Sequence, residues 1–323
     1  MTALSTSIAV VGAGAVGSYY GALLARAGHS VTLIGRAAHV AAIRDKGLML
    51  HKAGRVEVVP LHASTDVAAV HGAELVLCCV KSTDTGAVAR EMAPHLRSDA
   101  LVLSLQNGVD NGAALAAALP NTVLAAAVYV ATAMPEPGCV QHFGRGDLVI
   151  GPIDAQAARD PTLLQQLQQV VELMASADVP VKVSSDVRAE LWGKLLVNCA
   201  YNAISALAQQ PYGQMAAMPE IVHLQRAVVH EVVAVGHAEG VSLSLPESMA
   251  SMERIAGAMP AQLSSTAQDL ARGKRSEIDH LNGTVVRLGA KHGIATPVNQ
   301  ALYALVKLTE SGASRRAPFR EQL

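Results

Sequence analysis

A glycine-rich turn near the start of the chain constrains the fold more than any other feature. It comprises Gly12, Ala13, Gly14, Ala15, Val16 and Gly17. The turn follows an apolar run at residues 8–11 and opens a helix of small residues. In a dinucleotide-binding βαβ unit the first glycine makes the tight turn, the second lets the backbone approach a pyrophosphate, and the third lets helix and strand pack closely. We therefore predict that these six residues, termed the glycine turn, bind a dinucleotide. The alternative is a turn that only joins a strand to a helix.

The pattern of apolar residues divides the chain into two halves. Apolar runs alternate with helical segments in the first half, as in βαβ units around a parallel sheet, at residues 8–12, 30–34, 74–80 and 101–105. Further β-rich stretches cover residues 123–130, 139–143 and 148–150. Helical periods then dominate at residues 187–208, 220–239, 246–259, 261–272, 277–292 and 297–309. We predict an α/β fold, with a Rossmann-type doubly wound parallel sheet at residues 1–185 and an all-helical C-terminal domain at residues 186–323.

Composition excludes several classes of protein. Of the 323 residues, 51% are hydrophobic and 16% are charged, which is typical of compact domains and not of a disordered chain. The net charge is -1 and no basic stripe occurs, so no nucleic-acid partner is expected. The longest apolar run, at residues 122–134, is shorter than the roughly 20 residues of a spanning helix. Residues 1–7 lack the basic flank and cleavage site of a signal peptide. We therefore expect no membrane partner.

Cysteine and histidine spacing excludes other kinds of site. The four cysteines, Cys78, Cys79, Cys139 and Cys199, have no CxxC spacing. We expect buried reduced thiols and hence a cytoplasmic location. The 12 histidines show no ligand spacing such as HxxxH near an acid, so no metal site is predicted.

The end of the second predicted strand indicates which dinucleotide binds. NAD sites usually carry an acid there, which binds the ribose hydroxyls. This chain instead has Gly35-Arg36, and no acid occurs before Asp45. A guanidinium can pair with a 2′-phosphate, whereas an acid would repel it. Arg36 therefore favours NADP (NADPH), the alternative being an ordinary surface arginine.

Two further polar residues follow predicted strands. Lys81 comes directly after residues 74–80, and Asn107 follows residues 101–105 in Gln106-Asn107-Gly108. Ligands of doubly wound sheets lie beyond the carboxyl ends of the strands, so both side chains are candidates for cofactor binding. A solvated lysine and a turn-forming asparagine are the alternatives.

One predicted helix in the second half carries an unusual polar row. At about 100° per residue, Glu190, Lys194, Asn198, Asn202 and Ser205 fall within a stripe roughly 120° wide. A solvated helix face is the common explanation. However, asparagine is a poor helix former and an odd choice for such a face. A polar ligand beside the lysine explains the row equally well.

The chemistry of ketone reduction suits this row. Hydride addition creates an alkoxide, and a positioned lysine can stabilise that charge and give up its proton. Lys194 is therefore the candidate catalytic residue. A lysine in a cleft needs an acid to orient it, and Glu277 is a candidate, although the dipole of a helix beginning there would also favour an acid.

Several short motifs are spread along the chain. They are the glycine turn, Val80-Lys81, Gln106-Asn107-Gly108, Glu190-x-Trp192-x-Lys194-Leu195-x-x-Asn198-x-x-x-Asn202, Ser264-Ser265, Gln268-Asp269, Glu277-Ile278-Asp279-x-x-Asn282-Gly283 and Thr296-Pro297-x-Asn299. In these motifs the chain resembles the ketopantoate reductase (2-dehydropantoate 2-reductase) family over nearly its whole length. The lysine–asparagine helix and the Glu-Ile-Asp stretch are the specific parts of this resemblance.

The resemblance implies a reaction and a role for each residue. Members of the family use NADPH to reduce 2-dehydropantoate to pantoate, a step towards pantothenate and coenzyme A, in the cleft between a Rossmann domain and a helical domain. The resemblance implies that Lys194 is the proton donor and that the substrate ligands are Asn198, Asn202 and Ser265. It assigns Lys81, Asn107 and Glu277 as partners of the cofactor or of the lysine.

Two departures from the family pattern leave the substrate open. Tyr212 stands where well-studied members place an asparagine that touches substrate, and Thr266-Ala267 stands where methionine and leucine often occur. Alternatives are therefore an NADPH-dependent reductase of a different 2-oxo acid, another two-domain dehydrogenase, or a non-catalytic NADP-sensing protein. The apolar helical half could supply a homodimer interface, although a monomer fits equally well.

Overall fold

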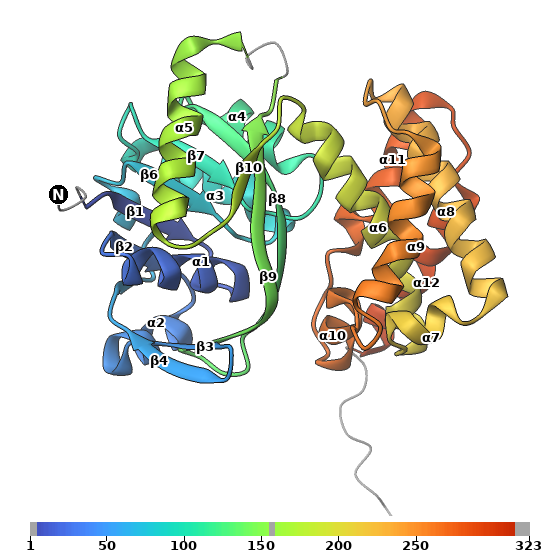
Figure 1. Ribbon diagram of the computed structural model, residues 1–323, viewed down its shortest axis with the longest axis horizontal. Helices are drawn as coiled ribbons and strands as arrows, with labels where there is room; N and C mark the ends of the chain where they lie inside the picture. The colour runs from blue at the N-terminus through green and yellow to red at the C-terminus, as the bar shows by residue number, and fades with distance from the viewer. Residues whose placement is uncertain (1–4, 155–158, 314–323) are drawn as a thin grey trace, which may run out of the picture. The chain divides into compact units, whose positions relative to one another are not determined.

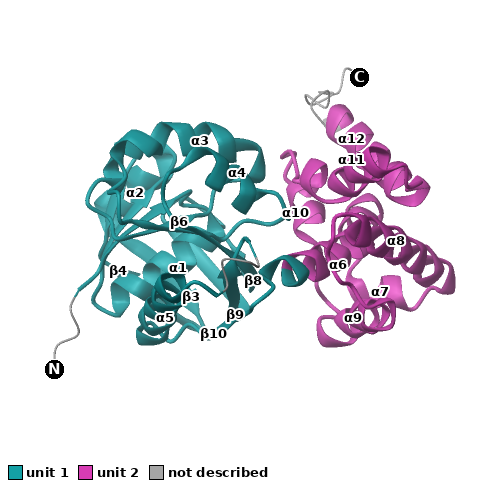
Figure 2. Ribbon diagram, turned by 90° about the horizontal axis from the view of Figure 1, so that it is seen from above, with its two compact units in different colours: residues 1–190 teal, residues 191–323 magenta. Residues whose placement is uncertain are grey.

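The computed structural model of the protein describes residues 5–154 and 159–313. The chain forms two compact units, which divide between Glu190 and Leu191 (Figure 2). Unit 1 contains a large sheet with helices, and unit 2 is helical (Figure 1). The division falls inside one helix, α6 (Val187–Ala208), whose bounds are those predicted for the first helix of the second half.

Unit 1 is built on a sheet in which most neighbouring strands are parallel. Its strands are β1 (Ser7–Val11), β2 (Ser30–Ile34), β3 (Leu48–Lys52), β4 (Arg55–Val59), β5 (His62–Ser64), β6 (Leu75–Cys78), β7 (Leu101–Ser104), β8 (Val123–Ala133), β9 (Cys139–Pro152) and β10 (Val181–Val183). The strand order is β4-β3-β9-β8-β7-β6-β1-β2-β5, and β10 pairs with β9. From β5 to β8 every pairing is parallel, with β1 between β2 and β6. The order reverses direction between β1 and β6, which is where doubly wound sheets bind ligands.

Helices cover both faces of the sheet, as the doubly wound prediction requires. They are α1 (Ala15–Arg26), α2 (Ala37–Lys46), α3 (Thr85–Met92), α4 (Asn111–Ala118) and α5 (Pro161–Ser176), with short 3-10 helices η1 (Val67–Val70), η2 (Ser82–Asp84) and η3 (Ala93–His95). Side chains of α1 and α5 share one buried core with the sheet, and side chains of α3 and α4 share a second (Figure 2). The sheet separates these two cores because successive residues of a strand point to opposite faces.

Two antiparallel pairs extend the parallel sheet. Strand β8 pairs with β9 through two register shifts, and β3 pairs with the edge strand β4. The β-rich stretches predicted at residues 139–143 and 148–150 therefore belong to one long strand, β9. Arg145 has a positive φ of 57° within β9. Its guanidinium lies over the Tyr129 ring and pairs with Asp147 at 2.7 Å, which holds the irregular strand in place.

Unit 2 packs its helices around α6. They are α7 (Tyr212–Ala216), α8 (Pro219–Ala238), α9 (Leu245–Ala258), α10 (Ser265–Ala271), η5 (Ile278–His280), α11 (Asn282–His292) and α12 (Pro297–Ala313). Buried Trp192 of α6 lies against Gly236 of α8, where a Cβ would come within 3.2 Å of the indole. The Tyr201 hydroxyl donates to the Met252 carbonyl of α9 at 2.9 Å. These contacts pack one face of α6 against α8 and α9.

Two predicted helices differ from the observed ones. Residues 277–292 form η5 and α11 rather than one helix, because Leu281 leaves the helical conformation. Asp279 of η5 is held instead by α12, where it accepts from the Tyr303 hydroxyl at 2.6 Å and from Lys307 Nζ at 2.8 Å. The helix predicted at residues 261–272 begins only at Ser265, because the Ser264 hydroxyl accepts from the Ala267 N–H and caps it.

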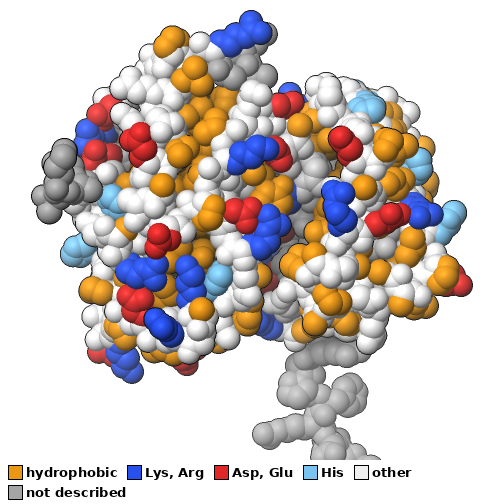
Figure 3. Space-filling view, in the orientation of Figure 1, with side chains coloured by type: hydrophobic (Ala, Val, Ile, Leu, Met, Phe, Trp, Pro, Cys, Tyr) orange, Lys and Arg blue, Asp and Glu red, His pale blue; other side chains and the backbone are white. Residues whose placement is uncertain are grey.

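Three structural features concern possible binding partners: surface charge, membrane-spanning helices and metal-binding groups. On the face drawn in Figure 3, Lys and Arg side chains lie among acidic ones in both units. Among the helices of the described residues, none is long and apolar enough to cross a membrane. Within the same described ranges, no group of three or more His, Cys, Asp or Glu residues could hold a metal ion.

Candidate active site

The glycine turn leaves β1 with the geometry of a phosphate-binding loop. Gly12 has a φ of 101°, and a Cβ there would lie 2.5 Å from Val80 N. A Cβ at Gly17 would lie 2.4 Å from the Gly12 carbonyl oxygen. Both positions therefore need glycine for close packing. A Cβ at Gly14, by contrast, would meet no heavy atom of the described residues within 4 Å, so the backbone there is open to a ligand.

Hydrogen bonds fix the turn and leave donors available. The N–H groups of Gly12 and Ala13 both donate to the Ile34 carbonyl of β2 at 2.9 Å. Gly14 is the N-cap of α1, so the N–H groups of Ala15, Val16 and Gly17 belong to the first turn, where no intrahelical acceptor exists. Such N–H groups and the positive end of the helix dipole suit an anion. The open backbone and these donors fit the pyrophosphate of a dinucleotide.

Arg36 lies beside this turn. It follows Gly35 at the end of β2 and is the exposed N-cap residue of α2. A Cβ at Gly35 would lie 2.7 Å from the Ala13 Cβ, so glycine at position 35 lets the end of β2 approach the turn. The Arg36 side chain therefore begins next to the glycine turn, on the β2 side of β1.

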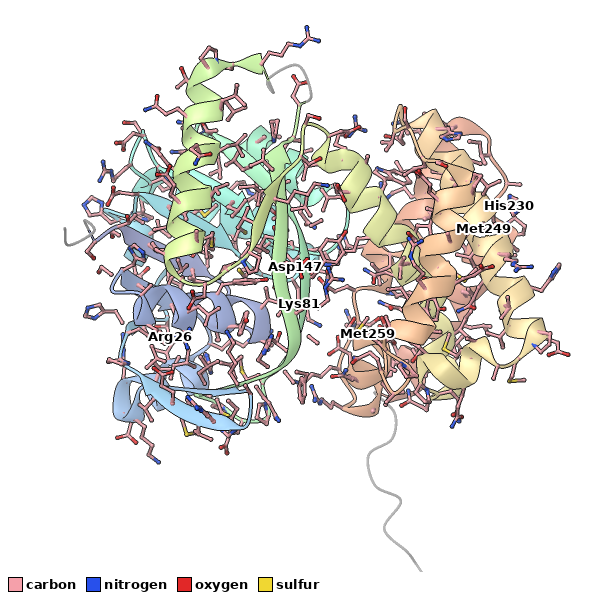
Figure 4. All side chains as sticks on the ribbon, in the orientation of Figure 1. Arg26, Lys81, Asp147, His230, Met249 and Met259 are labelled. Atoms are coloured by element: carbon pink, nitrogen blue, oxygen red, sulfur yellow. The ribbon has the colours of Figure 1, made fainter. Side chains whose placement is uncertain are left out.

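Lys81 and Asn107 lie on the other side of β1. Lys81 follows β6 and is exposed, and Asn107 follows β7 and is half-buried (Lys81 is labelled in Figure 4). Their strands are parallel neighbours, so both residues lie at the same edge of the sheet as the glycine turn. The topology thus brings together all the cofactor residues that the sequence predicted in unit 1.

A buried hydrogen-bonded group joins these two strand ends, and the sequence analysis did not find it. We term it the strand-end network, and it comprises Ser82, Thr85, Ser104, Gln106 and Asn111. Every member follows or ends β6 or β7, so a wider search beyond the strand ends would have included them. Gln106 Nε2 donates to the Val80 carbonyl at 3.0 Å and to Thr85 Oγ1 at 2.6 Å, and Ser104 Oγ donates to Gln106 Oε1 at 3.1 Å.

Asn111 completes the strand-end network. Its Oδ1 accepts from Thr85 Oγ1 at 2.9 Å, and its Nδ2 donates to Ser82 Oγ at 3.0 Å. The same Nδ2 donates to the Asn107 carbonyl at 2.5 Å, and Ser82 Oγ donates to that carbonyl at 2.9 Å. The backbone of Asn107 is therefore held by two side chains.

The polar row predicted on α6 continues from half-buried to buried positions. Glu190, Lys194 and Asn198 are half-buried, whereas Asn202 and Ser205 are buried. Ser205 Oγ donates to the Gln210 carbonyl at 2.9 Å and accepts from the Ser264 N–H at 3.2 Å. Ser205 is therefore used within unit 2, and Lys194, Asn198 and Asn202 remain as the candidates for ligand contact.

Tyr212, one of the departures from the family pattern, contacts the row directly. Its hydroxyl donates to Asn202 Oδ1 at 3.4 Å, and its ring packs on Tyr201 with centroids 4.6 Å apart. Burial raises the pKa of the Tyr212 hydroxyl well above its usual value, so it stays protonated and remains a donor. With Oδ1 accepting from tyrosine, the Asn202 amide N–H₂ is oriented as a donor.

The remaining predicted residues of unit 2 lie at helix starts. Ser265 is the exposed first residue of α10, and Glu277 is a half-buried N-cap residue of η5 rather than part of a longer helix. Ser264, the residue before Ser265, is fixed by donation to the Asn202 carbonyl at 3.1 Å. This bond brings Ser265 to the same part of α6 as Asn202. Thr266 and Ala267 are buried in unit 2, so they contribute to its packing.

Other residues of the motifs found in the sequence bond to neighbouring helices. Asn282 Nδ2 donates to the Cys199 carbonyl of α6 at 3.2 Å and to Asn299 Oδ1 at 2.9 Å. Glu231 of α8 accepts from the N–H groups of Val298 and Asn299, both at 2.9 Å, and so caps α12. These residues hold helices together. A hollow of about 490 Å³ in unit 1 lies between α2 and β5 and includes none of the predicted site residues.

The fold and the glycine turn together define the class of dinucleotide-binding proteins, to which the nicotinamide-dependent oxidoreductases belong. Sequence comparison narrows this class to one family. Residues 8–155 match the ketopantoate reductase PanE/ApbA family, and residues 186–310 match its C-terminal part. The chain belongs to the ketopantoate reductase PanE/ApbA family, whose members bind NAD(P)H.

Individual relatives support this assignment along the whole chain. The 2-dehydropantoate 2-reductase of Halobacterium salinarum is 36% identical over 307 residues, covering 94% of this chain and 98% of its own. The enzyme of the same name from Vibrio cholerae is 33% identical over 310 residues, covering 96% and 99%.

Solved structures show the same fold. A PanE/ApbA family ketopantoate reductase from Ralstonia eutropha JMP134 is 50% identical with a TM-score of 0.89, covering 96% of this chain and 100% of its own. A D-mandelate dehydrogenase solved with NADH and anilino(oxo)acetate has the same TM-score of 0.89 at 23% identity, covering 96% and 100%. The fold therefore occurs in proteins named for different substrates.

Proposed function

We propose that the protein is an NADPH-dependent reductase of 2-dehydropantoate, producing pantoate for pantothenate and coenzyme A biosynthesis in the cytoplasm. Residues 1–185 are proposed as the NADP-binding domain and residues 186–323 as the substrate and catalytic domain. The observation that carries the proposal is the row of Lys194, Asn198 and Asn202 on a buried helix of a PanE/ApbA family member.

The cofactor assignment depends on unit 1. The glycine turn would hold the pyrophosphate through the first N–H groups of α1, and Arg36 would pair with the 2′-phosphate. Lys81 and Asn107 would bind the rest of the cofactor from the ends of β6 and β7. The preference for NADP over NAD rests on Arg36 and the absence of an acid at the end of β2.

The chemistry depends on unit 2. Bound NADPH supplies a hydride to C2 of the oxo acid. Lys194 would donate a hydrogen bond to the C2 oxygen and transfer a proton from Nζ to it, leaving a 2-hydroxy acid. Asn198, Asn202 and Ser265 would bind the carboxylate and hydroxyl of the substrate as neutral partners. Glu277 would orient the lysine or the cofactor through its carboxylate.

The test is oxidation of NADPH by the purified protein with 2-dehydropantoate. General acid catalysis contributes about two orders of magnitude or more, so Lys194→Ala should lower kcat at least about 100-fold. Arg188→Ala is the control on the same helix, because Arg188 is exposed near the start of α6 and is not one of the predicted site residues. Tight NADPH binding without turnover of any 2-oxo acid would favour a non-catalytic NADP sensor instead.

A second candidate is an NADPH-dependent reductase of a different 2-oxo acid. The observation that favours it is the contact between Tyr212 and Asn202. Tyr212 is larger than the asparagine that the family pattern places there, and its hydroxyl donates a hydrogen bond to the Asn202 amide oxygen. Initial rates with a panel of branched and aromatic 2-oxo acids separate the candidates. A higher kcat/KM for another 2-oxo acid than for 2-dehydropantoate would assign that acid as the substrate and leave the proposed type of reaction unchanged.

A further inference from the structure

The strand-end network has a complete set of donors and acceptors. Its bonds use both amide hydrogens of Gln106, both amide hydrogens of Asn111, and the hydroxyl hydrogen of Thr85. All five members are less than one-tenth exposed. A fully satisfied buried network holds its atoms rigidly, whereas loss of one member leaves another polar atom buried without a partner. This network is therefore a rigid support at the ends of β6 and β7.

The network acts on the backbone of the predicted cofactor residues. Gln106 holds the Val80 carbonyl, and Val80 is the residue directly before Lys81. Asn111 and Ser82 hold the carbonyl of Asn107 itself. The bonds between Thr85 and Gln106 and between Thr85 and Asn111 connect these two held points. A substitution of Thr85 would therefore loosen the backbone at both Lys81 and Asn107, although Thr85 itself is not predicted to contact the cofactor.

Sheet topology indicates which half of the cofactor lies above the network. The order of the relevant strands is β2, β1, β6, β7. A dinucleotide whose pyrophosphate lies over the glycine turn at the end of β1 extends its two halves to opposite sides of β1. Arg36 follows β2 and is proposed to bind the 2′-phosphate, which belongs to the adenosine half. The nicotinamide half then lies over the ends of β6 and β7.

We infer that Thr85 and Asn111 are positioning residues that hold the nicotinamide side of the cofactor site in its binding geometry. They act through Lys81 and Asn107. The inference rests on the proposed function, because it requires that NADPH binds unit 1.

Two ligands and three variants test this inference. NADPH carries both halves of the cofactor, whereas 2′,5′-ADP carries the adenosine and its phosphates without nicotinamide. Thr85→Val removes the hydroxyl at nearly constant shape, and Thr85→Ser restores it. Thr83→Val is the matched control from the same loop, because the Thr83 hydroxyl is exposed and donates only to its neighbour Asp84 among the described bonds, at 3.1 Å. Dissociation constants are measured by fluorescence or calorimetry.

The expected result separates the two halves of the cofactor. Thr85→Val removes both buried hydrogen bonds of the Thr85 hydroxyl, so it should raise the Kd of NADPH at least about fivefold and change the Kd of 2′,5′-ADP less than about twofold. Thr85→Ser and Thr83→Val should bind both ligands as the wild type does. If Thr85→Val does not fold, Ser82→Ala carries the same test, since Ser82 also donates to the Asn107 carbonyl.

Three results would overturn the inference. They are unchanged NADPH binding by the Thr85→Val variant, equal weakening of both ligands, or failure of Thr85→Ser to restore NADPH binding. The wild type reports separately on the proposed function. If the wild type does not bind NADPH, the proposed function fails before any variant is considered, and the positioning role fails with it.

Discussion

Substitution by alanine at two glycines of the same turn should affect different properties, namely stability at Gly17 and cofactor binding at Gly14. At Gly17 a methyl group would lie 2.4 Å from the Gly12 carbonyl oxygen and 2.9 Å from Val10 Cγ1. Because the nearer atom is backbone, the turn must move to accept it. Overpacking of this kind costs about 3 kcal/mol at its upper range, and the better helix propensity of alanine returns about 1 kcal/mol. Gly17→Ala should therefore destabilise the protein by about 2 kcal/mol, or about 4–8 °C in Tm for a unit of this size.

Gly14→Ala should affect the cofactor instead of the fold. Gly14 has φ −81° and ψ −168°, which any residue adopts, and its Cβ would meet none of the described atoms within 4 Å. We expect a change in Tm of at most about 2–4 °C, the effect of alanine at an N-cap. A methyl group in the path of the pyrophosphate should cost about 1–3 kcal/mol, or about 5- to 150-fold in the Kd of NADPH.

The assay compares thermal unfolding without cofactor and NADPH titration for both variants. The reasoning would be refuted if Gly14→Ala bound NADPH as tightly as the wild type. It would also be refuted if Gly14→Ala lowered Tm as much as Gly17→Ala, because only Gly17 lacks room for a methyl group.

Three other predictions follow from buried or charged groups. Burial lowers the pKa of His39, whose Nδ1 accepts from the Gly138 N–H at 2.8 Å. The free energy of unfolding should therefore fall as pH drops below about 6.5, where the unfolded chain binds the proton first, and urea titrations should show a smaller pH effect in His39→Gln. Among the described residues the buried Gln225 side-chain amide makes no hydrogen bond of good geometry, so Gln225→Met should raise the free energy of unfolding by about 1–3 kcal/mol; a lower value would show that the amide has a partner. Arg36→Gln should raise the Kd of NADPH at least about tenfold and leave that of NADH nearly unchanged, since only NADPH has the 2′-phosphate; equal effects on both would remove Arg36 from cofactor selection.

Local sequence signals predicted the parts of the fold that depend on nearby residues. The glycine turn predicted β1 and α1 because Gly12 and Gly17 meet their packing partners within the same βαβ unit or at the adjacent strand end. The apolar period predicted the bounds of α6 because one face of this helix is buried along its length. A wider search beyond the strand ends would have included the members of the strand-end network but not the hydrogen bonds between them, since Thr85 and Asn111 meet only when β6 and β7 pair in the sheet.

Tertiary contacts also explain the misplaced elements of unit 2. The period at residues 277–292 is helical, but bonds from α12 to Asp279 hold η5 apart from α11. The sequence indicated that Tyr212 departs from the family pattern at a position expected to face the substrate. Its contact with Asn202 depends on α7, a short helix between longer ones that the apolar period did not indicate.

The most direct measurement of the central claim uses NADPH carrying deuterium in place of both hydrogens at C4 of the nicotinamide, so that transfer from either face delivers deuterium. The protein is incubated with this cofactor and 2-dehydropantoate or another accepted 2-oxo acid, and the product is examined by NMR. We predict a 2-hydroxy acid with deuterium at C2, formed in proportion to the NADPH oxidised and lost in Lys194→Ala. A product without deuterium at C2, or equal turnover by Lys194→Ala, would contradict the proposed reductase mechanism.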